Sequence, residues 1–511
     1  MRLEATPLGR LIDIDVYDKA IAGPLTRGTL RKCLLCDRPA AVCRKEETHT
    51  AAQLQEKIAA TIHSEDLVLI QQILNKAVDA ELDLDPKFGL VTPKTAGSHT
   101  DMTIELMRKS KHAVVPYLAE LFFLPLWEDS MPRLFQSARS IGLVAEQAMY
   151  RATGGVNTPV FTSSANCYLD RDRAPYPRYF NTPNQGAVVS KLCALEGAQD
   201  GIVFSSGMAA MSTSILSFAG SGDHVVLMDE LYGGTHSFAT GDFGKLGITH
   251  TFTATDAGAV CAAVTDKTTV IVIETPTNPL LSVVDIRQVA DFARAKGITT
   301  IIDNTFASPV NQNPYLLGID IVVHSGTKYM GGHGDLCCGA VVASRDNAQR
   351  IRALACHLGG SMNATECYLL ERSLKTMALR VERQSENAMA MAARLSDHPR
   401  VKRVYYPGLP ESPGHEIARS QMRGYGGMLS FDVDERTVDP DRFVRSLKLV
   451  QPAVSLGGVE TTICSPAATS HAPMSVEERE RIGITRSLFR LSVGIEHVDD
   501  LTADLDQALM Y

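Results

Sequence analysis

The sequence predicts an α/β fold, in which a mainly parallel sheet carries helices on both of its faces. From Thr158 onward, short apolar runs rich in β-branched residues recur, and several end beside Gly, Pro, Ser or Asp. Helical patterns such as Met208–Leu216 and Val289–Ala295 lie between them. Strands and helices that alternate in this way are typical of parallel sheets built from βαβ units. The predicted strands are Gly201–Phe204, Val225–Met228, Thr269–Ile273, Thr299–Ile302, Ile319–Val323 and Gly339–Ala343.

Length, charge and hydrophobic pattern limit the possible functions. A chain of 511 residues has room for two to four domains and a large core. The net charge of −8 and isoelectric point of about 6.0 give no electrostatic reason to expect nucleic acid or a membrane surface as a partner. The longest apolar runs are too short to span a bilayer, and the N-terminus has acidic residues from Glu4 onward without a signal-type apolar core. We therefore expect a soluble, cytoplasmic protein.

The eleven cysteines are scattered along the chain, and several lie in apolar contexts. This distribution does not resemble a secreted disulfide framework, so most of them are expected to be reduced packing residues. Cys33, Cys36 and Cys43 differ, because with His49 they could supply four tetrahedral zinc ligands. Their spacing departs from common zinc-finger patterns, so a zinc site and the absence of any metal both stay open.

The first 157 residues resemble two truncated enzymes of one pathway. Residues 1–63, with Gly9–Tyr17 and Arg31–Cys36, resemble the C-terminal half of the phosphoribosyl-dephospho-CoA transferases that act on citrate lyase's acyl carrier protein. Residues 64–157, with Gly97–Met102, resemble part of the helical triphosphoribosyl-dephospho-CoA synthases. Because both are incomplete, we expect a retained fold with a structural or interface role. The alternative is a module that still binds a CoA-like nucleotide or a carrier protein.

A lysine follows the predicted strand Ile319–Val323 at the end where open α/β sheets bind their ligands. Lys328 stands there beside Ser325 and Thr327. A lysine in this place can form a Schiff base with an aldehyde cofactor, while the hydroxyls donate hydrogen bonds to its phosphate. Taken alone, the motif would equally fit a surface lysine after a strand.

Other predicted strand ends carry polar or aromatic groups that suit the same cofactor. After Phe204 the chain opens a helix, so the backbone N–H groups of Gly207 and Met208 can meet a phosphate. Asp303 directly follows another strand and could keep a pyridine nitrogen protonated. Tyr232 offers an aromatic face to the ring. The simpler interpretations are a helix start, a turn aspartate and a core tyrosine.

Seven motifs mark the second part of the chain: Tyr176-x-Arg178, Ser205–Met208, Tyr232–Thr235, Glu274–Pro279, Asp303–Thr305, Ser325–Tyr329 and Arg490–Glu496. They occur in the order seen in the Cys/Met-metabolism family of pyridoxal-phosphate enzymes, which residues 158–511 resemble throughout. The family includes cystathionine γ-synthase, cystathionine γ-lyase and methionine γ-lyase. The resemblance implies a fold-type I enzyme with a seven-stranded sheet in a large domain (158–390) and a smaller C-terminal α+β domain (391–511).

The resemblance also implies a role for each matching residue. Lys328 would be the Schiff-base lysine and proton shuttle, Asp303 the pyridinium partner and Tyr232 the stacking ring. Arg490, aided by Ser455, would clamp the substrate α-carboxylate, which suits a bidentate guanidinium. Asn278 would lie near the cofactor hydroxyl, and the phosphate would be held by Ser206, Gly207, Met208, Ser325 and Thr327.

Assembly is implied by the same resemblance. In this family the Tyr-x-Arg pair reaches the phosphate of the neighbouring subunit, so Tyr176 and Arg178 would complete a site across an interface. A homodimer, usually paired into a homotetramer, is therefore expected, and the isolated monomer should be inactive. The partners expected are an amino-acid substrate and further copies of this chain.

The reaction implied by the resemblance is elimination or replacement at the γ-carbon of an L-amino acid, through a Lys328 aldimine and a β,γ-unsaturated intermediate. Cystathionine-handling members carry an Arg and a Glu where this chain has Ser237 and Val454, and Gly234 replaces the cysteine of methionine γ-lyases. Because an unpaired distal charge is costly to bury, we expect a small or uncharged γ-leaving group. Two alternatives are a synthase or O-acylhomoserine sulfhydrylase, and a binding protein that acts through its N-terminal module.

Overall fold

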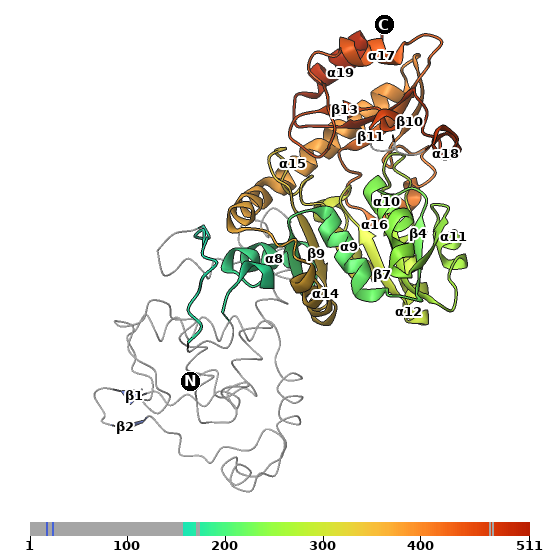
Figure 1. The fold of residues 1–511 in the computed structure, drawn as a ribbon. Coiled ribbons are helices and arrows are strands. Elements are labelled where there is room, and N and C mark those ends of the chain that lie inside the picture. The colour runs from blue at the N-terminus through green and yellow to red at the C-terminus, as the bar shows by residue number, and fades with distance from the viewer. Residues whose placement is uncertain (1–16, 19–22, 25–156, 170–173, 470–471, 473–474) are drawn as a thin grey trace. The chain divides into compact units, whose positions relative to one another are not determined.

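The computed structural model describes residues 157–169, 174–469, 472 and 475–511, together with Tyr17–Asp18 and Gly23–Pro24 (Figure 1). The chain divides into two compact units, residues 1–130 with 151–154 and residues 131–150 with 155–511. In the first unit, β1 (Tyr17–Asp18) pairs antiparallel with β2 (Gly23–Pro24). The candidate zinc ligands Cys33, Cys36, Cys43 and His49 lie outside the described residues, as does nearly all of the predicted helical segment 64–157.

A seven-stranded sheet forms the centre of the second unit, as the resemblance described above implies. Five neighbouring strands pair in parallel, and within this sheet β9 alone runs against them. Six of the strands match predicted runs. The seventh, β5, was not predicted because its sequence alternates polar and aromatic residues at the sheet edge. In spatial order the strands are β3 (Asp200–Phe204), β9 (Gly339–Ala343), β8 (Ile321–His324), β7 (Thr299–Asp303), β6 (Thr268–Glu274), β4 (His224–Met228) and β5 (Thr249–Thr253).

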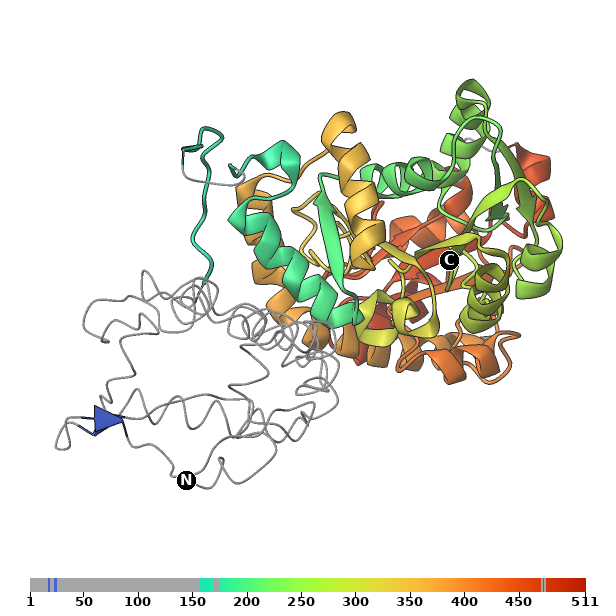
Figure 2. The same cartoon turned by 90° about the horizontal axis from the view of Figure 1, so that it is seen from below.

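Helices cover both faces of this sheet, because successive strand residues point to opposite sides. On β6, Ile271 and Ile273 enter one core cluster, whereas Val270 and Val272 enter the other. Complete burial of such a side chain contributes about 1.5–3 kcal/mol, which explains why these strands are apolar throughout. The first cluster includes α8 (Pro183–Glu196), α12 (Ile286–Lys296) and α15 (Ala364–Ser396); the second includes α9 (Gly207–Phe218), α10 (Gly233–Asp242) and α14 (Arg345–Leu358) (Figures 1 and 2).

A second, smaller sheet has its own core, in which Phe431, Phe443 and Phe489 contact one another. Its order is β10 (Val401–Tyr405), β11 (Met428–Val433), β14 (Leu488–Ser492), β13 (Thr462–Cys464) and β12 (Gln451–Pro452). The first four are joined antiparallel, and β12 pairs in parallel with β13. The remaining described α-helices are α11 (Ala257–Ala262), α13 (Ser308–Asn311), α16 (His415–Gln421), α17 (Pro440–Ser446), α18 (Val476–Arg481) and α19 (Val498–Ala508).

The helix α15 belongs to both halves of this unit. It contains 33 residues and contacts α8 beside the large sheet, and β10, β11 and α19 beside the small one. The predicted boundary between residues 390 and 391 therefore falls inside a continuous helix.

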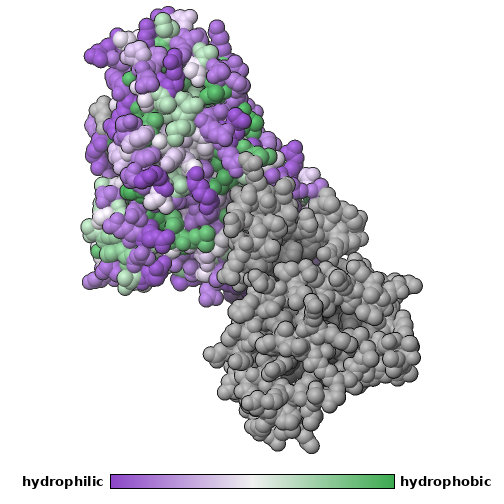
Figure 3. Space-filling model, turned by 180° about the vertical axis from the view of Figure 1, so that it is seen from behind, coloured by the Kyte–Doolittle hydropathy of each residue, from purple (hydrophilic) through white to green (hydrophobic). Residues whose placement is uncertain are grey.

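No helix in the described part of the chain combines the length and apolar character that a membrane crossing requires. On the face drawn in Figure 3, hydrophilic residues surround scattered small apolar patches.

Candidate active site

Three strands of the large sheet end with polar groups at one edge. Glu274 is the last residue of β6 and pairs in register with Asp303, the last residue of β7. Asp303 in turn pairs with Val323 of β8, five residues before Lys328. Because the carboxyl ends of parallel strands share one edge, these predicted groups come together at the place where open α/β sheets bind ligands.

The Lys328 amine is held at this edge. Lys328 Nζ donates a hydrogen bond to Ser455 Oγ at 2.9 Å. The backbone carbonyl of Lys328 accepts a hydrogen bond from Gly332 N at 2.7 Å. Burial lowers the pKa of Lys328, and the positive charge of Arg490 lowers it further. The amine therefore loses its proton more readily than an exposed lysine, as a nucleophilic amine must.

Two residues of the small domain, Arg490 and Ser455, lie beside Lys328 at this edge of the large sheet. Arg490 lies on β14 and is 5% exposed; it donates to Asn278 Oδ1 at 2.7 Å and to the Ser455 carbonyl at 3.3 Å. Ser455 has φ of +76°, in the left-handed region that a non-glycine residue seldom adopts. Such strain persists only where surrounding contacts impose it, and it concentrates at functional sites. Both polar groups of Ser455 are used here, one by Lys328 and one by Arg490.

The Asp303 carboxylate is set by Thr305, which the sequence did not single out. Thr305 N donates to Asp303 Oδ1 at 3.0 Å, while Thr305 Oγ1 accepts from Ser325 N at 2.8 Å. Burial raises the pKa of Asp303, although the bonds from Thr305 and the nearby His324 and Lys328 act in the opposite direction. A carboxyl group in this state is suited to share a proton with a ring nitrogen.

The start of α9 has a geometry that suits an anion. Ser206 caps the helix by accepting from Ala209 N, and Gly207 and Met208 are its first residues. A Cβ on Gly207 would lie 2.9 Å from Ser325 Cβ, so glycine permits the helix end to approach Ser325 closely. The Thr327 hydroxyl is engaged elsewhere, since it donates to the Cys338 carbonyl (3.1 Å) and accepts from Cys338 N (3.0 Å). The N–H groups at the helix start, together with Ser325, are therefore suited to hold a phosphate.

Tyr232 precedes α10, and its ring is partly exposed. A Cβ on Gly234 would lie 2.4 Å from the Tyr232 ring and 3.0 Å from Met208 Sδ. A side chain at position 234 would therefore collide with the ring in its present position. This gives a physical reason for glycine at position 234.

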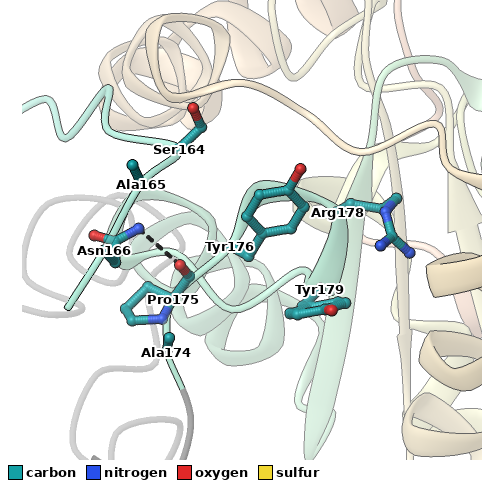
Figure 4. Close-up of a pocket in the computed structure, with 8 residues that line it drawn as sticks. All are labelled: Ser164, Ala165, Asn166, Ala174, Pro175, Tyr176, Arg178 and Tyr179. Atoms are coloured by element: carbon teal, nitrogen blue, oxygen red, sulfur yellow. Dashed lines mark hydrogen bonds between the residues drawn. The ribbon is translucent and has the colours of Figure 1, made fainter. Parts of the chain in front are cut away.

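Four of the predicted residues lie apart from this group or are exposed. Arg178 donates to the Cys356 carbonyl at 2.6 Å and stacks on the rings of Tyr176 and Tyr179. These three residues line an open pocket of about 500 Å³ (Figure 4), to which no strand-end residue contributes. Ser237 on α10 is exposed, and Val454 is 68% exposed.

Two further residues support the site and were missed from the sequence. Glu274 accepts hydrogen bonds from two segments of the site, although it was noted only as part of a motif. Arg380 on α15 is buried and donates to the carbonyls of Tyr329 (2.8 Å), Met330 (3.4 Å) and Ser373 (2.9 Å); burial lowers its pKa to about 10. The position of Glu274 at the end of an apolar run was a usable signal, whereas Arg380 is about fifty residues from the turn it contacts.

The groups at this edge fit pyridoxal 5'-phosphate. A helix start with Ser325 suits a phosphate, Asp303 suits the pyridine nitrogen, and the Lys328 amine suits the aldehyde. Among the described residues, no cluster of His, Cys, Asp and Glu is arranged to hold a metal ion.

Family models match three parts of the chain. The model described as "Cys/Met metabolism PLP-dependent enzyme" matches residues 141–510. The N-terminal part matches "Apo-citrate lyase phosphoribosyl-dephospho-CoA transferase" at residues 1–65 and "ATP:dephospho-CoA triphosphoribosyl transferase" at residues 68–160. All three resemblances expected from the sequence are therefore confirmed.

Individual relatives agree with the first of these models. A cystathionine γ-lyase of Bacillus subtilis is 42% identical over 70% of this chain and 95% of its own, and an L-methionine γ-lyase of Fusobacterium nucleatum is 42% identical over 65% and 85%. The crystal structure of a cystathionine γ-lyase from Lactobacillus plantarum, complexed with L-serine, matches with a TM-score of 0.69 and 37% identity over 73% of this chain and 98% of that one. The chain belongs to the Cys/Met-metabolism family of pyridoxal-phosphate-dependent enzymes.

Proposed function

We propose that the enzyme catalyses γ-elimination, or γ-replacement, on an L-amino acid with a small or uncharged γ-leaving group. The observation that carries this proposal is the meeting of Lys328 Nζ with Ser455 Oγ beside the Arg490 guanidinium. An amine with a lowered pKa next to a buried guanidinium is suited to bind an amino acid and to move its α-proton.

Each residue of the site then has a defined task. Pyridoxal phosphate, when bound, supplies an electron sink for negative charge at the substrate's α-carbon. Arg490 exchanges its bond to Asn278 Oδ1 for bonds to the substrate carboxylate. Lys328 Nζ accepts the α-proton and can release it again nearby, while Ser455 Oγ orients this nitrogen. The Asp303 carboxylate holds a proton at the ring nitrogen.

The absence of charge at two positions supports the proposed substrate class. Neither Ser237 nor Val454 offers a partner for an ammonium or carboxylate group at the distal end of a substrate. A second candidate is cleavage of cystathionine, which is favoured by the relatives named cystathionine γ-lyase and β-lyase at 41–42% identity. A third is synthesis by γ-replacement, since a cystathionine γ-synthase of Arabidopsis thaliana is 39% identical over 75% of this chain.

A substrate panel tests these possibilities. The purified enzyme would be incubated with methionine, homocysteine, cystathionine, O-acetylhomoserine and a 4-halogenated amino acid, with and without an added thiol. We expect ammonia and a 2-oxo acid from a substrate other than cystathionine. Highest kcat/KM for cystathionine would overturn the proposed substrate class, and a new amino acid formed only with thiol would identify a synthase.

The double variant Ser237→Arg/Val454→Glu should raise the kcat/KM for cystathionine relative to methionine by about fivefold. The reason is that it supplies a cation and a carboxylate for the distal end of cystathionine, and an exposed ion pair contributes up to about 1 kcal/mol, which corresponds to about fivefold. The measurement is the ratio of the two kcat/KM values. The variant Ser237→Ala/Val454→Ala is the control, because it changes both positions without adding charge.

Incorporation of pyridoxal phosphate into the cofactor-free enzyme should speed up as pH rises, with a midpoint below the ordinary lysine value of about 10.4. Only the neutral amine of Lys328 is nucleophilic, and both burial and Arg490 lower its pKa. The rate of the absorbance change, measured from pH 6 to 11, gives this midpoint. A midpoint at or above about 10.4 would contradict the prediction.

Assembly and location follow from the same proposal. Tyr176 and Arg178 would reach the site of a second copy, so we propose a homodimer or homotetramer, to be tested by light scattering.

The eight cysteines in the described part of the chain are free, which supports a reducing compartment such as the cytoplasm. The other class of function, in which the N-terminal part binds a CoA-like ligand, predicts that dephospho-CoA binds to the full chain.

A further inference from the structure

Glu274 occupies a buried position between two segments of the site. It ends β6 and is 5% exposed. Its Oε2 accepts from Tyr232 N at 2.7 Å, and its Oε1 accepts from Asn278 N at 2.9 Å. Each carboxylate oxygen thus holds the main chain of a different segment, one before α10 and the other after β6.

These two N–H groups belong to residues that face the proposed cofactor. Tyr232 carries the ring expected to stack on it, and Asn278 carries the amide that contacts Arg490 Nη1 at 2.7 Å. The side chain of Glu274 therefore fixes the backbone of the two residues that carry the Tyr232 ring and the Asn278 amide. A change in its length or in its hydrogen-bonding pattern changes the separation of the ring and the amide.

Burial of the Glu274 carboxylate is unfavourable, and its two hydrogen bonds to backbone N–H groups offset part of this cost. Burial raises the pKa of Glu274 well above its usual range, and the neighbouring Asp303 raises it further; the two backbone N–H bonds act against this and favour the ionised form. An acidic side chain in such a place is costly unless its oxygens are used. Here both are used, and both by main-chain donors of the site.

A neighbouring carboxylate provides a contrast. Glu230 is also near the turn of Asn278, where its Oε2 accepts from Thr277 Oγ1 at 2.9 Å and from Ser282 Oγ at 2.8 Å. One oxygen of Glu230 accepts both bonds, and both donors are hydroxyl groups. Glutamine can reproduce these bonds with its single carbonyl oxygen, but it cannot reproduce the two-oxygen arrangement of Glu274.

We propose that Glu274 is a positioning residue, which holds Tyr232 and Asn278 at the separation that pyridoxal phosphate and the Arg490 guanidinium require. This inference rests on the proposed function, because it takes Tyr232 and Asn278 as residues of the cofactor site. This role requires no contact of Glu274 with the cofactor or the substrate. It acts through the two segments that it joins.

The test compares Glu274→Gln with Glu230→Gln in the full-length, cofactor-depleted protein. In Glu274→Gln the side-chain NH₂ faces a backbone N–H, so one segment must move away. Binding of pyridoxal phosphate requires the original separation and must reverse this movement. We therefore expect the dissociation constant of the cofactor, measured by absorbance titration, to rise about tenfold or more, the size of effect that an unsatisfied buried donor produces. The circular dichroism of the bound cofactor should change as well, because the stacking ring is displaced.

The matched Glu230→Gln variant should bind the cofactor within about twofold of the wild type and keep its dichroism. Glu274→Asp, which retains two acceptor oxygens on a shorter arm, should give an intermediate dissociation constant and keeps the test informative if Glu274→Gln does not fold. Wild-type cofactor affinity and dichroism in Glu274→Gln or in Glu274→Asp, with only a lower melting temperature, would overturn the proposal. A wild-type protein that does not hold the cofactor on Lys328 would instead overturn the proposed function, and this inference with it.

Discussion

Replacement of Lys328 by alanine should lower kcat/KM by more than about 10³-fold on the best substrate. General acid–base catalysis by a positioned side chain contributes about 10²–10⁴-fold, and this variant also loses the covalent attachment of the cofactor. The Lys328 amine has a lowered pKa and a defined orientation toward Ser455 Oγ, which a mobile surface amine lacks. The measurement is steady-state turnover, together with mass spectrometry after borohydride reduction.

Two comparisons make the Lys328 result specific. Lys245→Ala removes an exposed lysine that pairs with Asp242 on the surface, and its turnover should equal that of the wild type. Reduction with borohydride should add the mass of the cofactor to a peptide containing Lys328 in the wild type and in Lys245→Ala only. Retention of more than about a tenth of the activity in Lys328→Ala would show that another group moves the proton.

Replacement of Arg490 by lysine should lower kcat/KM by about 10²-fold, mainly through a higher KM. Lysine keeps the positive charge but lacks the planar fork that binds a carboxylate through two parallel bonds. A hydrogen bond to a charged group contributes about 1.5–3 kcal/mol, which corresponds to a factor of about 10–150. The measurement is the separate determination of kcat and KM.

A second substitution separates the charge of Arg490 from its geometry. Arg490→Leu removes both, so the pKa of Lys328 should rise, and the pH midpoint of cofactor incorporation with it; in Arg490→Lys this midpoint should stay in place. Arg486→Lys, at an exposed arginine that pairs with Asp441, is the control and should leave KM unchanged. An unchanged KM in Arg490→Lys would contradict the assignment of the carboxylate site.

The sequence predicted the strand ends well because the signals there are local. Asp303 and Lys328 each follow an apolar run, and parallel strands bring such ends together whatever the details of the loops. The edge strand β5 was missed because its two exposed threonines break the apolar pattern that marks the buried strands. The hydrogen bonds that Glu274 accepts and those that Arg380 donates join segments that are far apart in the sequence. They depend on the tertiary fold, so no local sequence pattern predicts them.

The boundary of the small domain, which the resemblance places between residues 390 and 391, lies inside α15. This helix continues to Ser396 because its apolar face is buried in the core beside the large sheet and in the core beside the small one.

The long helix α15 connects the segments of the site to one another. Three side chains on one of its faces, Arg380, Gln384 and Asn387, bind the carbonyls of Tyr329, of Gly458 and of both Gly494 and Glu496. Those carbonyls lie in the segments that carry Lys328, Ser455 and Arg490. At 1.5 Å per residue, the three side chains lie within about 10 Å along the helix axis. One helix therefore sets the spacing of the three segments that carry the amine, the hydroxyl and the guanidinium.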